Sequence, residues 1–256
     1  MPDRPLPRRH LEFPQWPAAV YVIGDVHGCY DLLLALEDMI LADAATVAGE
    51  KWLVLVGDYV DRGPYAAQVL AHLQLPPPDG FRRIALTGNH EVMMLDALLR
   101  GTGGRNWIAN GGDETLRSYG LEPERLLGLP RVKWPLSLQV RIPGKDLAFL
   151  ENLPISLSLP GLSVVHAGLR RGVPLKEQSE TDLLWSRPDY QPEVLADGPR
   201  LVHGHTPLAV PFASPHRINV DTGAFATGRL TAARLTPDCA VKFLQTHAGG
   251  FPALAE

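Results

Sequence analysis

Cysteine is scarce in this chain, and its scarcity limits the kinds of scaffold and site that the protein can have. Two of the 256 residues are cysteine, Cys29 and Cys239, and they do not form a CxxC motif. The sequence therefore argues against a scaffold held by disulfides and against a metal site built from thiolates. So few cysteines also fit a reducing compartment, and we expect the protein to be cytoplasmic.

Long apolar runs and basic clusters are also missing from the sequence. No apolar run is long enough to span a membrane, and the proline-rich start, "MPDRPLPRRHLEFPQWP", lacks the apolar centre of a secretory signal. The net charge is −4 and no block of lysine and arginine stands out. Neither nucleic acid nor a membrane surface is therefore expected as a partner. We predict that residues 1–19 form a loosely held N-terminal arm.

The composition is that of an ordinary globular protein, with 45% hydrophobic and 20% charged residues. A chain of this length can bury a sizeable core, and we predict a single domain over residues 20–256. Helical periodicity weakens near residues 101–160, where glycines and prolines are frequent. We interpret this stretch as an insertion of helices and loops beside a site, and not as a second domain.

Short apolar runs that end in glycine, histidine and acidic residues recur along the chain. In order, the runs with the residues that follow them are "AVYVI" with "GDVHG", "KWLVLV" with "GDYVDRG", "RRIALT" with "GNHE", "GLSVV" with "HAG", "RLV" with "HGH" and "RINV" with "DTG". Runs this apolar predict buried strands. Helical patterns follow the first three runs, so these three strands are predicted to be parallel and joined by crossover helices.

Individual residues predict where these helices begin and end. Asp31 is placed to cap the first helix, and Pro64 occupies what we expect to be the first position of the second helix. Gly101 is a natural stop for the third helix. Near the end of the chain, "RLTAARLTPDCAVKFLQTH" predicts two strands that flank a "TPD" turn.

The polar residues that follow the strands are suited to bind metal ions. In open α/β sheets, ligands bind outside the carboxyl ends of the strands, which is where these aspartate, histidine, asparagine and arginine residues lie. Carboxylate, imidazole and amide oxygen without thiolate suit Mn, Fe or Zn. Two such ions, roughly 3.5–4 Å apart and sharing one carboxylate, would need about this many ligands.

The motifs "GDVHG", "GDYVDRG", "GNHE", "HAG" and "GH" occur in the order found in the PPP-type, calcineurin-like metallophosphoesterases. The sequence resembles this family from about Ile23 to Thr206. The family includes serine/threonine protein phosphatases and their bacterial and phage relatives. The resemblance implies an α/β fold in which a β-sandwich is flanked by helices, in αββα layers. It also implies two divalent metal ions that activate a water for in-line attack on phosphorus.

The resemblance implies a set of metal ligands, in which two residues bind the first ion, one bridges both ions and three complete the second. In that order they are Asp25 and His27, then Asp58, then Asn89, His166 and His205. Mn²⁺ is the ion we expect, with Fe and Zn as the alternatives. His203, two residues from His205, would point the same way in an extended segment and is the competing ligand.

The resemblance also implies the residues that act on the substrate. Arg62 and Arg187 would bind the phosphate, and Arg187 would do so from a short "W-S-R" motif, with a structural surface arginine as the alternative. His90 would donate a proton to the leaving group, and Asp61 would hold its ring. Glu91 is explained equally well by chemistry and by favourable placement at the start of a helix.

Several residues near the motifs have structural interpretations by default. Asp221, in "DTG", is interpreted as a turn former or as a carboxylate behind the ligands. Four residues of the predicted insertion are assigned to loop packing, with a place at the substrate rim as the alternative. They are Trp107, Asn110, Gly111 and Gly112.

The resemblance predicts a phosphomonoester hydrolase like the bacterial serine/threonine protein phosphatases, acting on a phosphorylated protein or a small phosphoester. A symmetrical bis(5'-nucleosyl)-tetraphosphatase is the first alternative, although those relatives depart from "VDRG" and "GNHE". A scaffold that binds metal without catalysis is the second. The chain lacks the "SAPNYC" segment of the eukaryotic enzymes and has "HGH" in place of "RAH". No regulatory subunit is therefore expected.

Overall fold

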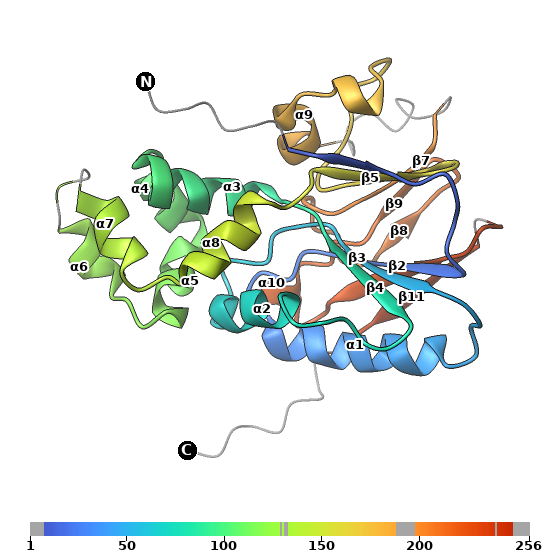
Figure 1. The fold of residues 1–256 in the computed structure, drawn as a ribbon, viewed down its shortest axis with the longest axis horizontal. Coiled ribbons are helices and arrows are strands. Elements are labelled where there is room, and N and C mark those ends of the chain that lie inside the picture. Colours follow the sequence, from blue (N-terminus) through green and yellow to red (C-terminus); the bar gives the residue numbers. More distant parts are fainter. Residues whose placement is uncertain (1–7, 129, 131–132, 188–197, 239, 248–256) are drawn as a thin grey trace.

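Two β-sheets stacked face to face organise the computed structural model, which describes residues 8–128, 130, 133–187, 198–238 and 240–247. Helices lie against the outer faces of both sheets, and a group of helices gathers at one end of the sandwich (Figure 1). In the described part of the chain, no helix is both long and apolar enough to cross a membrane.

The five-stranded sheet has the strand order β11-β10-β2-β3-β4. Its parallel strands are β2 (Ala19–Ile23), β3 (Lys51–Leu55) and β4 (Phe81–Ala85), joined by helices α1 (Tyr30–Ala44) and α2 (Ala66–Leu73). β10 (Thr231–Leu235) pairs antiparallel with both β2 and β11 (Val241–Gln245). The predicted strand–helix alternation and the two C-terminal strands are confirmed.

The six-stranded sheet has the order β1-β5-β6-β7-β9-β8. Its parallel strands are β6 (Leu162–Val165), β7 (Arg200–His203) and β9 (Arg217–Asn219). β5 (Ser156–Leu159) and β8 (Phe212–Ala213) run antiparallel to β6 and β9, and β1 (His10–Glu12) pairs with β5. Each sheet therefore contains three parallel strands whose carboxyl ends can supply site residues.

Successive residues of the central strands face two different cores, which explains why the strand sequences are apolar throughout. Val20 and Val22 of β2 lie between the sheets, together with Val164 and Val202 of the other sheet. Their neighbours Tyr21 and Ile23 face the opposite side, toward α1 and α2. A strand that is covered on both faces cannot alternate with polar residues.

A smaller core covers the outer face of the six-stranded sheet. Leu183 and Leu184 of α9 (Glu180–Trp185) are buried with Val165 and Leu201 of that sheet. With α1 and α2 on the other outer face, the arrangement is the predicted sandwich with αββα layers. Short helical turns at Leu175–Glu177 (η4) and Ala224–Thr227 (α10) complete the elements between the strands of this half.

Helices fill the insertion and gather beside α3 (Asn89–Leu95), which continues as a π-helical turn, η1 (Asp96–Arg100). They are α4 (Gly104–Trp107), η2 (Ile108–Gly112), α5 (Asp113–Ser118), α6 (Pro123–Leu127), α7 (Trp134–Gln139) and α8 (Gly144–Glu151). The sequence predicts an insertion that extends to about residue 160. In the structure the helices end at Glu151, because the residues after it enter β5 of the six-stranded sheet.

Part of the predicted N-terminal arm is ordered, contrary to expectation for residues 8–19. β1 adds a strand to the sheet edge, and the Arg8 guanidinium donates to a carbonyl oxygen at the end of α8. The Phe13 ring packs edge-on against Trp52 at 4.5 Å, and the Trp16 indole donates to a backbone carbonyl after β5. Aromatic side chains anchor a proline-rich segment that has no helical or alternating pattern of its own. Residues 1–7 lie outside the described residues.

Two predicted helix starts are wrong and one predicted stop is confirmed. α1 begins at Tyr30 with Cys29 at the N-cap, so Asp31 lies in the first turn and does not cap it. α2 begins at Ala66, two residues after Pro64. Gly101 ends the third helical segment with a left-handed φ of 64°, as glycine allows without strain.

Candidate active site

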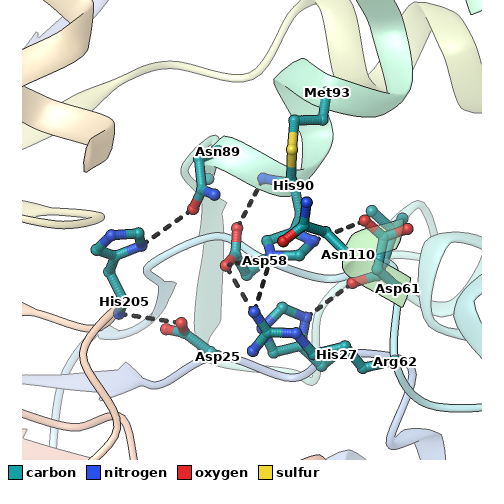
Figure 2. A network of polar contacts seen from close by, with 12 residues as sticks. Asp25, His27, Asp58, Asp61, Arg62, Asn89, His90, Met93, Asn110 and His205 are labelled. Atoms are coloured by element: carbon teal, nitrogen blue, oxygen red, sulfur yellow. Dashed lines mark hydrogen bonds and ion pairs between the residues drawn. The ribbon is translucent and has the colours of Figure 1, made fainter. Parts of the chain in front are cut away.

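Residues that follow the carboxyl ends of strands from both sheets come together in one cluster, and Figure 2 shows several of them, among them Asp25, Asp58, Asn89 and His205. The five-stranded sheet supplies the residues that follow β2, β3 and β4, and the six-stranded sheet supplies those that follow β6 and β7. In chain order these include Asp25, His27, Asp58, Asn89, His90, His166 and His205. Residues separated by up to 180 positions in the sequence therefore become neighbours.

The four predicted ligands of the second metal ion converge. The Asn89 side-chain oxygen Oδ1 is 2.8 Å from His166 Nε2 and 3.1 Å from His205 Nδ1. His166 Nε2 is also 3.4 Å from Asp58 Oδ1. Nitrogen and oxygen atoms that could all bind one cation thus face a common point, and Asp58, His166 and His205 form a candidate metal-binding group.

A second candidate metal-binding group shares Asp58 with the first. His27 Nε2 lies 3.5 Å and His90 Nε2 lies 3.9 Å from the other carboxylate oxygen of Asp58, and these three residues form the group. The predicted acid His90 therefore lies almost as close to Asp58, the predicted bridging residue, as the predicted ligand His27 does. One carboxylate with an oxygen toward each group is the arrangement that a bridge between two cations requires.

Asp25 is the remaining predicted ligand, and its surroundings favour a bound cation. Its Oδ2 accepts a hydrogen bond from the backbone N–H of His205, whereas its buried Oδ1 has no hydrogen-bond partner among the described residues. A side chain at Gly204 would place its Cβ 1.9 Å from this same Oδ1. A buried carboxylate oxygen without a partner is costly unless a cation binds it.

The pKa values of the carboxylates and imidazoles in this cluster also favour the binding of a divalent cation. Burial, and then the charges of Asp221 and Asp58, hold the pKa of Asp25 well above its usual range. Burial raises the pKa of Asp221 to about 6 and lowers the pKa of His27 to about 3. Neighbouring carboxylates that repel each other and imidazoles that stay neutral become favourable ligands once a metal ion supplies positive charge. The residues present therefore fit the implied metal ions.

The outer nitrogens of two histidines are held by backbone carbonyls. His27 Nδ1 donates to the carbonyl of Val60, at 2.9 Å, and His166 Nδ1 donates to that of Val56, at 3.2 Å. These bonds leave each Nε2 without its proton and directed at Asp58. Histidines that bind metals are commonly oriented in this way.

His205, and not His203, joins the cluster, although the sequence alone expects both side chains to point the same way. His203 ends β7, and its Nδ1 donates to the carbonyl of Gly204. His205 lies beyond the strand with a φ of 65°, so strand alternation no longer applies to it. The left-handed residue turns its side chain toward Asn89.

Strained backbone is concentrated in the site. Five non-glycine residues among those described have positive φ, and every one of them is a predicted site residue: His27, Asp58, Asp61, Arg62 and His205, with φ between 43° and 72°. Such conformations cost about 1–3 kcal/mol each and persist only where surrounding contacts enforce them. The backbone is therefore held in the shape that brings these side chains together.

His90 and Asp61 form the predicted acid pair. His90 Nδ1 donates to Asp61 Oδ2 at 2.6 Å, and Asp61 is fully buried. Burial by itself would lower the pKa of His90, but the charges of Asp58 and Asp61 outweigh it and raise that pKa. The ring is thus held in place and favoured in its protonated form, as a proton donor requires.

The two predicted phosphate-binding arginines occupy different positions. A terminal nitrogen of Arg62 is 3.2 Å from His90 Nε2, and its guanidinium lies over the ring of Phe225 at 4.6 Å. Arg187 is exposed just after α9. Burial lowers the pKa of His205 to about 3, and the positive charge of Arg187 contributes to this lowering. Arg62 therefore adjoins the acid, whereas Arg187 is exposed and its charge reaches His205, a member of the group with Asp58 and His166.

Glu91 has a role that the sequence does not reveal. It is fully buried, and its carboxylate accepts hydrogen bonds from the backbone N–H groups of Asp58, Tyr59 and Gly88 at 2.7–2.8 Å. Burial, and then the charge of Asp58, raise its pKa to about 7. Glu91 thus ties the turn that carries Asp58 to the start of α3. Its bond to Gly88, the N-cap of α3, agrees with the predicted placement at a helix start, whereas its bonds to Asp58 and Tyr59 go beyond that prediction.

Three other residues beside the site were not predicted to act there. Trp107 and Thr115 of the insertion donate hydrogen bonds to Asp61, and Phe225 of α10 contacts His27 and Arg62. The sequence assigns Trp107 to loop packing by default, with a place at the substrate rim as the alternative. A "W-x-x-NGG-x-x-T" pattern is visible in the sequence, but nothing in it says which strand-end residue it would meet.

The fold and the ligand cluster define a class of metal-dependent enzymes in which an αββα sandwich carries the metal ligands at its strand ends. Residues 18–241 match the calcineurin-like phosphoesterase family, and the chain belongs to that family. The resemblance deduced from the five motifs is confirmed.

Relatives within the family carry two kinds of name. Serine/threonine-protein phosphatase 1 of Salmonella typhimurium is 31% identical over 238 residues, which cover 89% of this chain and 96% of that protein. The asymmetrical bis(5'-nucleosyl)-tetraphosphatase PrpE of Bacillus cereus is 29% identical over 234 residues, covering 83% and 89%. A serine/threonine phosphatase structure from Saccharomyces cerevisiae shares the fold, with a TM-score of 0.60 at 15% identity and coverage of 95% and 84%.

Proposed function

We propose that this phosphoesterase is a phosphomonoester hydrolase that acts on phosphorylated proteins, as its relative from Salmonella is named to do. The supporting observation is the arrangement of Arg62, His90 and Asp61 beside the shared carboxylate of Asp58. A phosphate binder, a proton donor and its carboxylate partner adjoin two metal-binding groups. We propose two divalent ions, Mn²⁺ with Fe or Zn as alternatives, and the cytoplasm as the compartment.

The metal ligands set up the reaction. The ions, held by Asp25, His27, Asp58, Asn89, His166 and His205, would offset the charge of the phosphate and lower the pKa of a water molecule near it. Asp58 lies between the two groups and therefore determines how both are placed. Glu91 fixes the backbone of Asp58 through its own hydrogen bonds, so the position of the shared carboxylate does not depend on metal alone.

Two side chains act on the phosphoester itself. The guanidinium of Arg62 has donors that match two non-bridging phosphate oxygens. His90 gives its Nε2 proton to the leaving oxygen as the P–O bond breaks, while its Nδ1 proton remains bonded to Asp61. The oxygen of water becomes the fourth oxygen of the released phosphate, and the proton that this water loses returns through solvent to His90. The exposed Arg187 would add a second positive charge, which acts on the part of the site that contains His205.

A nucleotide substrate is the competing function, and a relative supports it. The tetraphosphatase from Bacillus covers most of the chain at nearly the same identity as the phosphatase. It is named as the asymmetrical enzyme, whereas the symmetrical enzyme is the alternative expected from the sequence. We favour the protein substrate because the relative with the higher identity and coverage is a protein phosphatase.

One set of assays separates these functions. Purified protein, loaded with Mn²⁺, is tested on a phosphoserine peptide, on diadenosine tetraphosphate and on p-nitrophenyl phosphate. The proposal predicts a higher kcat/KM for the peptide than for the nucleotide. A preference for diadenosine tetraphosphate would overturn it, and inactivity on all three would favour a scaffold without catalysis. The Asp58→Asn protein, purified in parallel, measures the contribution of contaminating phosphatases.

A further inference from the structure

The insertion supplies the surroundings of the carboxylate that holds the acid. The Trp107 indole N–H lies 2.9 and 3.0 Å from the two oxygens of Asp61, and the Thr115 hydroxyl donates to Oδ1 at 2.7 Å. The Thr115 oxygen in turn accepts the backbone N–H of Asp61 at 2.8 Å. With His90 on Oδ2, each oxygen of Asp61 has more than one donor at hydrogen-bond distance.

The same insertion also holds the neighbouring Arg62. The carbonyl oxygen of Gly111 accepts the backbone N–H of Arg62 at 3.0 Å. Gly111 has a φ of 104°, and a Cβ added there would lie 2.7 Å from the Arg62 nitrogen. We call Trp107, Gly111 and Thr115 the insertion clamp.

The insertion clamp acts on a stretch of backbone that is strained. Asp61 and Arg62 are consecutive residues with φ values of 72° and 69°, where non-glycine side chains are disfavoured. Such conformations need contacts from outside the turn to persist. The clamp residues lie 46 to 54 positions further along the chain, and Trp107 and Thr115 are fully buried.

We propose that Trp107 and Thr115 are positioning residues for leaving-group protonation, acting through Asp61 on His90. This proposal rests on the proposed role of His90 as the proton donor. The insertion then belongs to the active site, because it orients the His90 ring and does not only border the substrate. Without either donor, Asp61 can rotate about its side-chain bond, and His90 loses its fixed direction toward the leaving oxygen.

The test removes single donor groups and keeps the shape of the side chains. Trp107→Phe loses the indole N–H, and Thr115→Val loses the hydroxyl at nearly equal volume. Each variant should lower kcat for a phosphoserine peptide by about tenfold, with KM and metal content nearly unchanged. Turnover of p-nitrophenyl phosphate should fall less than about threefold, because nitrophenolate leaves without a proton. Thr115→Ser, which keeps the hydroxyl, should behave like wild type.

A matched variant and a double mutant separate positioning from a general structural effect. Trp52 is a buried tryptophan in the core between the sheets, and its Nε1 has no hydrogen-bond partner among the described residues. Trp52→Phe should leave the ratio of the two kcat values unchanged. In an Asp61→Asn background, Trp107→Phe should add little further loss on the phosphoserine peptide, because both changes break one chain of contacts.

The outcomes distinguish this proposal from the proposed function. Equal losses on both substrates, or full additivity with Asp61→Asn, would overturn the positioning role. If wild type hydrolyses p-nitrophenyl phosphate but not the phosphoserine peptide, the proposed substrate is wrong. The same comparison is then made with glycerol 2-phosphate, whose alkoxide is also a poor leaving group, and a selective loss there still supports the positioning role.

Discussion

The site has two halves that are built in different ways. The metal-binding half consists of the candidate ligands at the strand ends of two sheets, with Asp58 from one and His166 and His205 from the other. The acid half, Asp61, Arg62 and His90, takes its residues from one sheet and is held by helices of the insertion. The first half therefore depends on how the sheets pack, and the second on how the insertion docks.

Asp58 belongs to both halves, so its replacement should have the largest effect. Asp58 lies in both metal-binding groups and also accepts the backbone N–H of His90. Asp58→Asn keeps the shape and removes the charge that two cations would share. Activity should fall roughly 10³-fold or more, above the 10- to 100-fold that is typical of an outer-shell partner.

Elemental analysis measures the metal content of this variant, which should drop below two ions per chain. The control is Asp43→Asn, since Asp43 is an ion-paired carboxylate at the far end of α1. That variant should retain the metal content of wild type. Two ions and near-normal turnover in Asp58→Asn would show that the site does not share this carboxylate.

Replacing His90 should impair the acid half of the site and leave the metal-binding half intact. His90→Asn should reduce kcat for a phosphoserine peptide by about 10²–10⁴-fold, because a serine alkoxide must be protonated as it leaves. Turnover of p-nitrophenyl phosphate should fall far less, and both metal ions should stay bound. Asp61→Asn should show the same selectivity more weakly, since Asp61 only directs the ring.

The measurement for His90 is kcat on both substrates, with metal content determined in the same samples. His72→Asn is the control, because His72 is also paired with a carboxylate but lies on α2, within the structural ion pair to Glu37. Loss of metal from His90→Asn would move His90 into the metal-binding half, where its distance of 3.9 Å from Asp58 also permits a place.

The arginines should affect phosphate binding and leave the metal content unchanged. Arg62→Ala should weaken inhibition by free phosphate roughly 10- to 100-fold, which corresponds to the binding free energy of one or two charged hydrogen bonds. Arg62→Lys should recover little, because a single ammonium cannot donate two parallel bonds. Arg187→Ala should have a smaller effect, since its side chain is exposed at the rim. Inhibition constants for phosphate test both, and a wild-type value for Arg187→Ala would remove Arg187 from the site.

Phe225 should produce the smallest effect, through the Arg62 guanidinium that lies over its ring. Phe225→Leu removes a cation–π contact at a partly exposed position, which should weaken phosphate inhibition by roughly two- to fivefold. Phe212→Leu is a matched control, because the Arg217 guanidinium lies over the ring of Phe212 in a similar contact on the outer strand β8. Equal changes in the two variants would show that Phe225 does not position Arg62.

The parts of the fold that depend on neighbouring residues can be predicted from the sequence. Apolar runs such as "AVYVI" predict the central strands, and their two-sided burial explains the absence of alternation. β1 cannot be predicted in this way, because a strand of three residues at a sheet edge depends on the partner strand β5 more than on its own pattern. The starts of α1 and α2 also differ from the prediction, because loop backbone that carries site residues precedes each helix.

The ordered motifs of the sequence were sufficient to predict the candidate site residues, because they place Asp58, Asn89 and His166 directly after strands. Tertiary structure decided how they meet. His205, the ligand that the resemblance implies, joins the cluster and His203 does not, because His205 adopts a left-handed backbone. Glu91 and Trp107 reach the site through hydrogen bonds to Tyr59 and Asp61, 32 and 46 positions away. Spacing in a sequence predicts what lies on one element, but the packing of sheets and helices fixes which distant side chains share a hydrogen bond.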